Sequence, residues 1–139
     1  MEKNLMDLDE NFGGVIHRYT RTQALADGVL VDVTETAREA GFKISVALTT
    51  DAWSKAVLWT DADSERQVPQ DESGRLWDVL WMAYIAARRA KESSRVPFSL
   101  SVIPRDSSAT EPRALTLHMH IGPGDESEPV ITLMTPLED

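Results

Sequence analysis

The longest apolar stretch of the chain predicts a central helix. Residues 76–87 carry a single charge, that of Asp78. An apolar surface that runs almost all the way round a helix is typical of an element packed on several faces. We expect this helix to span residues 75–93 and to form the centre of the core. Trp77 and Trp81 lie one helical turn apart on it, and we expect both to be buried.

Three apolar stretches after this helix predict strands. They are "FSLSVI", "ALTLHMHI" and "VITLM", and they are joined by the polar connections "PRDSSATEP" and "GPGDESEP". Short polar connections of this kind suit an antiparallel meander. In the middle stretch His118 and His120 alternate with apolar residues, so the two histidines are expected on the same face.

The stretch "HRYTRTQALADGVLVDVTETAREAGF" predicts two short helices separated by a strand. Thr20 and Gln23 have the spacing of a capping box, in which each residue accepts a hydrogen bond from the other's main chain. Gly28 and Gly41 stand where a left-handed residue ends a helix. Asp32 or Thr34 is expected to cap the second helix, and "VIHRYT" is expected to form a strand before the first.

The middle of the chain predicts a strand, a helix and a polar break. "FKISVALTT" alternates apolar and polar residues, as in a half-buried strand. Thr50 is expected to cap a helix in "DAWSKAVLW", and "TDADSERQVPQDESG" to form a surface loop with a fragment of helix.

These elements together predict an α+β fold. We expect a single domain over residues 15–139, in which an antiparallel sheet, with a C-terminal meander of three strands, packs on the central helix and on short N-terminal helices. Residues 1–14 are acidic and carry few spaced apolar positions, so they are expected to form a flexible tail.

Composition excludes several classes of protein. The chain of 139 residues contains no cysteine, so thiol catalysis, thiolate metal sites and disulfides are ruled out. It has neither a signal-peptide pattern nor a long apolar segment, so we expect a cytoplasmic protein without a membrane partner. The 23 acidic and 14 basic residues give a net charge of −9, which disfavours direct binding to nucleic acid. A protein with a basic surface is the more plausible partner.

Acidic residues gather in segments that are predicted to be loops. Such clusters are commonly just solvated, but they can also steer a protein to a basic partner. The candidate partner-binding residues are Asp61, Asp63, Glu65, Asp71, Glu72, Asp125, Glu126 and Glu128. Asp78, alone on the central helix, is expected to pair with an arginine, for which Arg75 is one local candidate.

Two weaker patterns would suit an enzyme. His17 and Tyr19 precede a helix N-terminus that could receive an anion; alternatively, they fasten the local structure by hydrogen bonds. His118 and His120 could bind one metal ion with an acidic third ligand from the loop at residues 125–128; alternatively, they lie on a polar sheet face. No phosphate-binding or nucleophile motif is present, and we predict neither a cofactor nor a metal.

Three segments of the chain resemble a known family. "YTRTQALADGVLVDVTETAREAGF", "GRLWDVLWMA" and "HIGPGDESEPVITLM" are similar to small bacterial proteins of unknown function that are carried on plasmids, phages and integrative elements. The resemblance extends from Phe12 to the end of the chain. It implies a genomic setting in which accessory genes often counter host defences such as restriction or CRISPR systems, and it assigns no catalytic residue.

The sequence therefore predicts a non-enzymatic, acidic interaction protein. Its expected target is a host protein that handles nucleic acid or acts in defence, inhibited in the manner of antirestriction or anti-CRISPR proteins. The alternative is a small enzyme acting on a nucleotide or phosphorylated substrate, or with a metal, through His17 and Tyr19 or through His118 and His120. A third hypothesis is a component that assembles through its sheet edges. Oligomeric state stays open.

Overall fold

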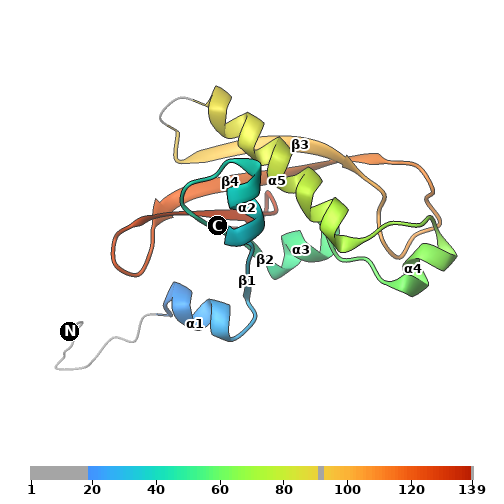
Figure 1. Ribbon diagram of the computed structural model, residues 1–139, viewed down its shortest axis with the longest axis horizontal. Helices are drawn as coiled ribbons and strands as arrows, with labels where there is room; N and C mark the ends of the chain where they lie inside the picture. Colours follow the sequence, from blue (N-terminus) through green and yellow to red (C-terminus); the bar gives the residue numbers. More distant parts are fainter. Residues whose placement is uncertain (1–18, 91–92, 139) are drawn as a thin grey trace.

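The fold is a single five-stranded sheet covered by helices (Figure 1). It is seen in a computed structural model, which describes residues 19–90 and 93–138. The elements in chain order are α1 (Arg21–Ala26), β1 (Leu30–Asp32), α2 (Thr34–Ala40), β2 (Ser45–Thr49), α3 (Thr50–Ala56), α4 (Asp61–Arg66), α5 (Glu72–Arg89), β3 (Arg95–Val102), β4 (Arg113–Pro123) and β5 (Pro129–Met134). The predicted α+β class and the C-terminal meander are confirmed.

The strands lie in the order β1-β2-β5-β4-β3, so β1 and β3 are the edges. The β3, β4 and β5 strands pair antiparallel, whereas β2 pairs parallel to β5, with Val46 opposite Ile131. Sequence patterning predicted the meander but not this parallel pair. Because both neighbours of β2 are strands and helices cover it, Val46, Ala47 and Leu48 are all buried, rather than alternating as in a half-buried strand.

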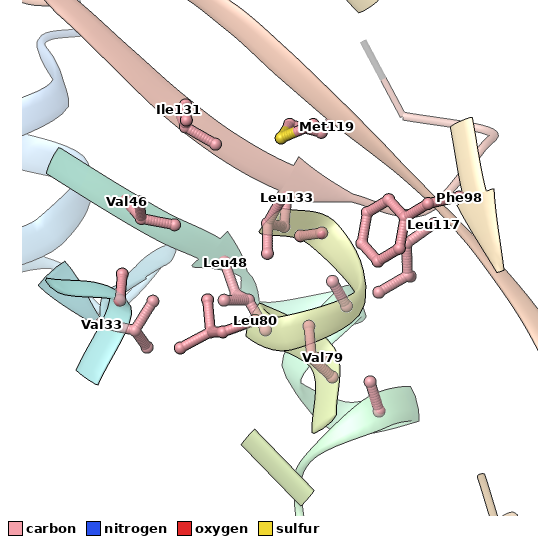
Figure 2. Close-up of a cluster of buried hydrophobic side chains, with 14 of the residues drawn as sticks. Val33, Val46, Leu48, Val79, Leu80, Phe98, Leu117, Met119, Ile131 and Leu133 are labelled. Atoms are coloured by element: carbon pink, nitrogen blue, oxygen red, sulfur yellow. The ribbon is translucent and has the colours of Figure 1, made fainter. Parts of the chain in front are cut away.

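The core lies between one sheet face and three of the helices. Figure 2 shows Val79 and Leu80 of α5 against residues of the sheet such as Leu48, Leu117 and Leu133. Alanines of α2 and α3 join the same cluster. In Figure 1, α5 crosses this face of the sheet diagonally. Arg21 of α1 instead donates a hydrogen bond to Thr132, whose side chain alternates with those of the core residues Ile131 and Leu133. Helix α1 therefore lies on the face of the sheet opposite the core, which we call the second face.

Several predicted helix ends are confirmed and others shift by a residue. The capping box of Thr20 and Gln23 is present, and Gly28 adopts a φ of +77° after α1. The N-cap of α2 is Val33, without a side-chain bond, although Asp32 accepts a hydrogen bond from the Thr34 N–H. Thr49, not Thr50, caps α3. Tyr19 and Thr20 are not in a strand, and the rest of the predicted "VIHRYT" strand lies outside the described residues.

Gly41 is needed where α2 ends against α5. Its φ is +125°, and a Cβ there would lie 2.6 Å from Cε1 of Tyr84. We expect Gly41→Ala to lower the free energy of unfolding by about 3 kcal/mol, through both strain and steric conflict. Urea denaturation will measure it. The control is Gly28→Ala, which has a positive φ but open space around it, and which should cost only about 1 kcal/mol. Equal effects would contradict this explanation.

None of the helices within residues 19–90 and 93–138 has both the length and the apolar character needed to span a bilayer.

Candidate binding surface

Among the described residues, Asp63 has the most buried carboxylate, and the residue is only 1% exposed. It completes a capping box with Thr60 at the start of α4, accepts a hydrogen bond from Arg105 Nε at 2.6 Å, and pairs with Arg66. Burial alone would raise the pKa of Asp63, but the hydrogen bonds from Arg105, Thr60 and Arg66 outweigh it and hold that pKa far below its usual value. Asp63 thus joins α4 to the β3–β4 connection.

Because of this network, the folded protein should become less stable at acidic pH. Because the pKa of Asp63 is lower in the folded than in the unfolded chain, its stabilisation is complete above the unfolded value of about 4 and is lost as the pH falls below it. We expect Asp63→Asn to lower the unfolding temperature at pH 7 by roughly 5–10 °C and to flatten its fall between about pH 5 and pH 2. Thermal unfolding followed by circular dichroism will test this.

The control for this experiment is Asp61→Asn, two residues away on the exposed side of α4. It should leave both the unfolding temperature at pH 7 and its acid dependence close to those of the wild type. The same acid dependence in Asp63→Asn and the wild type would contradict the assignment.

Four other candidate carboxylates also bond within the fold. Asp125 accepts hydrogen bonds from the main-chain N–H groups of Arg21 and Thr22 and from the Thr22 hydroxyl, and these outweigh burial and lower its pKa. Asp71 caps α5, Glu72 accepts from the Trp59 N–H, and Glu128 accepts from the Glu126 N–H. Asp125 therefore ties the β4–β5 hairpin to the start of α1.

The remaining three candidates point into solvent. Asp61, Glu65 and Glu126 are exposed, and within the described ranges none of their carboxylates forms a hydrogen bond or an ion pair. The predicted fragment of helix is α4, which contains Asp61, Asp63 and Glu65. Glu72 is the first residue of α5. The expectation that these four carboxylates lie in loops is therefore wrong. Their part in binding a partner stays a prediction.

The candidate enzyme residues are spread over the second sheet face. His118 and His120 share that face, as expected, but Nδ1 of His118 accepts a hydrogen bond from Arg95 Nε at 3.0 Å. Tyr19 donates to Asp27 at 2.8 Å. Tyr19 and His120 line one hollow of about 270 Å³, together with Arg21. His17 lies outside the described residues.

Nothing in the described part of the chain gathers three or more histidine or carboxylate side chains around a point where a metal ion could bind. The third ligand that the sequence offered for His118 and His120 was Asp125, Glu126 or Glu128. Asp125 is bonded to α1 instead, so the hairpin loop does not complete a site with the histidines.

A groove runs between α5 and β3. Two hollows of about 460 and 440 Å³ meet along it and share Asp78 and Ser101. We define the α5–β3 groove by six residues of its walls: Trp77, Asp78, Trp81 and Met82 on α5, and Ser99 and Ser101 on β3. Pro112 and Ala114 of the neighbouring segment extend it. The groove is therefore open to an elongated ligand along the edge of the sheet.

The two tryptophans of this groove are exposed, contrary to the expectation that they are buried. Trp77 is 38% and Trp81 44% exposed. Their rings stack with centroids 6.2 Å apart, and Trp81 stacks in turn on Tyr84, over which Arg88 lies. The buried apolar residues of α5 are Val79, Leu80 and Ala83. The tryptophans stand on another side and form a stacked aromatic surface.

Asp78 is also exposed, between the two tryptophans in the sequence. The expected pair with Arg75 does not form. Arg75 is 6% exposed and donates to the main-chain oxygens of Val57 and Ile103, each at 3.0 Å. Burial lowers the pKa of Arg75, whereas the nearby carboxylates act to raise it. Within the described residues no ion pair neutralises Asp78.

Aromatic faces beside an unpaired carboxylate form a suitable site for a cation. A lysine or arginine side chain can lie over a tryptophan ring and be attracted by its π electrons. The same side chain can pair with Asp78. The groove thus offers apolar contact, cation–π attraction and charge within one turn of α5.

Comparison with known protein families identifies the family of this chain. Residues 8–139 match the family described as "Family of unknown function (DUF6573)". The chain belongs to this family. No curated protein and no solved structure matches the chain. The match covers almost all of the chain, so the groove and the second sheet face both lie within the DUF6573 region.

Sequence reasoning missed the groove because it assigned α5 to the core as a whole. One signal was available: Trp77, Asp78 and Trp81 place a charge beside two aromatic residues one turn apart. On a helix buried on every side this aspartate would be left without water. The charge therefore indicated the side of α5 that faces solvent.

Proposed function

We propose that this DUF6573 protein is a non-enzymatic interaction protein that binds a partner with a basic surface through the α5–β3 groove. The observation that carries the proposal is the stacked and exposed pair of Trp77 and Trp81 beside Asp78. Large exposed apolar patches rimmed by polar groups are typical of interaction sites, and tryptophan is enriched among the residues that dominate binding energy.

The charge of the protein supports a basic partner. At −9 it repels nucleic acid and attracts positively charged protein surfaces over long range. Asp61, Glu65 and Glu126 are free to contribute to this field, since they are exposed. The field raises the rate of encounter with a basic partner, while the groove supplies the contacts that hold it.

The partner class that fits best is a nucleic-acid-handling protein of a bacterial host. Such proteins present the basic surfaces with which they bind phosphate, and an acidic protein can occupy them. The resemblance to proteins of plasmids and phages favours a host target in restriction, CRISPR or a related process, and a cytoplasmic setting. The proposed outcome is inhibition of that target.

Affinity capture followed by mass spectrometry tests the proposal. The wild type and the variant Trp77→Ala/Trp81→Ala serve as parallel baits in a bacterial lysate. Each protein captured by the wild type alone is then purified and tested for direct binding. We expect a basic partner that binds the wild type directly and binds the tryptophan variant more weakly. A partner that binds both baits equally, or no direct binding by any captured protein, overturns it.

A competing enzymatic function gains no support from the described geometry. His118 is held by Arg95, and the tyrosyl hydroxyl of Tyr19 donates to Asp27. Tyr19→Ala is therefore a useful control in the capture experiment. It removes an exposed aromatic residue that lies outside the groove.

A further inference from the structure

The edge of the sheet at β3 carries main-chain groups that point away from β4. Ser94 and Ile121 face each other, and the Ile121 N–H donates to the Ser94 oxygen at 2.8 Å. In an antiparallel pair, directly opposed residues alternate between hydrogen-bonded and non-bonded pairs. Starting from Ser94, the even-numbered residues of β3 therefore bond to β4. The main-chain groups of Arg95, Pro97, Ser99 and Ser101 face outward.

Two residues of this outward set, and Ile103 just after the strand, have main-chain groups that are already bonded or lack a donor. The Ser93 hydroxyl donates to the Arg95 oxygen at 2.8 Å. Pro97 has no N–H to donate. An outward-facing position on an edge strand is where proline is usually found in a sheet. Past the end of the strand, the Ile103 oxygen accepts from Arg75. Each end of the edge is thus closed by the protein itself.

Ser99 and Ser101 lie between these closed ends. Among the described residues, no side chain bonds to the main chain of either one; the Ser99 hydroxyl instead pairs with that of Thr116. Both hollows of the α5–β3 groove reach this segment. An N–H and a C=O from each serine are therefore presented to the groove, opposite the side of α5 that carries Asp78 and Trp81.

We propose that an extended segment of the partner adds to β3 as a sixth strand in the α5–β3 groove, with a lysine or arginine side chain against Asp78. This inference rests on the proposed function and names its mode of recognition. Main-chain bonds to an open strand edge supply affinity, and pockets for alternate side chains supply specificity. Here the outward groups of Ser99 and Ser101 supply the bonds.

Charge complementarity selects the occupant. Asp78 is the charged residue shared by the two hollows, and Asp71 lies at the end of the groove where α5 begins. Side chains of an added strand that point toward α5 would meet Asp78, Met82 and the tryptophans. A basic residue with apolar residues two positions before and after it matches that series. An acidic segment would be repelled.

The test uses a defined probe, the acetylated and amidated peptide Thr-Val-Thr-Lys-Thr-Val-Thr. Its binding to the ¹⁵N-labelled protein is followed by NMR. We expect the amide signals of Ser99 and Ser101 to shift and their hydrogen exchange to slow, because each gains a hydrogen-bond partner. A peptide with glutamate in place of lysine should bind at least about tenfold more weakly.

Two further peptides separate strand addition from other modes of binding in the same groove. Each is N-methylated on one alternate set of residues. Only one set of N–H groups in an added strand points to β3, so one methylated peptide should lose at least about tenfold in affinity, and the other should keep it. Equal affinities for the two would overturn strand addition, and yet leave the groove as the proposed binding site.

A variant of the protein gives an independent readout. Ser101→Pro removes an outward N–H without removing a bond to β4, and Ser101→Thr is its matched control. The proline variant should bind the probe at least about tenfold more weakly than the threonine variant. The N-methylated peptides decide the matter if the proline variant does not fold.

A second copy of this chain is the rival occupant. Sedimentation velocity of the protein alone should show a monomer, with the Ser99 and Ser101 amides exchanging rapidly. A dimer in which these amides are already protected would mean that β3 pairs with β3, and would overturn the proposal. Absence of any probe binding at millimolar concentration would overturn it too.

Discussion

Replacing Arg75 with alanine is expected to lower the free energy of unfolding by about 3 kcal/mol, a large part of the stability of a domain of this size. The guanidinium donates to the main-chain oxygens of Val57 and Ile103 and to the Gln70 side chain, and it lies 4.7 Å from the centre of the Trp59 ring. The substitution leaves buried main-chain acceptors without a donor, which costs more than the bonds themselves contribute.

Chemical denaturation of Arg75→Ala and Arg89→Ala will check this expectation. Arg89 lies on the same helix but is exposed, so its replacement should change the free energy of unfolding by less than about 0.5 kcal/mol. Arg75→Ala should also weaken partner binding, because it disturbs the groove wall near Ile103. A small effect on stability, comparable to that of Arg89→Ala, would show that Arg75 does not hold α5 to the segments that follow α3 and β3.

The double variant Trp77→Ala/Trp81→Ala is expected to weaken binding of the captured partner by at least about thirtyfold, as for a pair of dominant interface residues. The two rings are exposed and stack mainly on each other and on Tyr84. Their loss should therefore cost little stability. Isothermal titration calorimetry measures the affinity, and thermal unfolding verifies that the variant remains folded.

Tyr19→Ala and Leu137→Ala are the controls for the tryptophan variant. Both remove a large exposed side chain, and neither residue lines the groove. They should bind the partner with wild-type affinity. A loss of affinity in Tyr19→Ala equal to that in the double variant would move the binding site to the hollow lined by Tyr19 and His120, and would contradict the proposed site.

Local patterns predicted the parts of the fold that depend on neighbouring residues. The Thr20–Gln23 capping box, the left-handed Gly28 and the alternation of Leu117 and Met119 with histidines all appear as expected. Each depends on residues a few positions apart. The helical periodicity of α5 is equally local, although the helix begins at Glu72 rather than at residue 75 and ends at Arg89.

Features that depend on distant residues were not predictable in this way. The parallel pairing of β2 with β5 joins residues 85 positions apart in the chain, such as Val46 and Ile131. The exposure of Trp77 and Trp81 follows from which side of α5 the sheet covers, and the period of a helix does not specify that side when apolar residues surround it. Asp63 illustrates the same limit, since its burial depends on Arg105 in a later connection.

The sequence did not predict the position of the candidate groove, and the basic partner that it did predict stays a prediction. The sequence indicated an acidic protein and named eight candidate carboxylates, which it placed in loops. The structure uses five of these carboxylates for caps and bonds within the fold: Asp63, Asp71, Glu72, Asp125 and Glu128. The groove on α5 and β3 depends on the sheet order, which places β3 at an edge.

Binding of the partner in the α5–β3 groove can be tested by mapping the complex with NMR. The captured partner, or its binding segment, is added to ¹⁵N-labelled protein. We expect the largest signal changes at the indole N–H groups of Trp77 and Trp81 and at the amides of Ser99 and Ser101. Changes confined to Asp61, Glu65 and Glu126, or to the hollow around Tyr19 and His120, would contradict it.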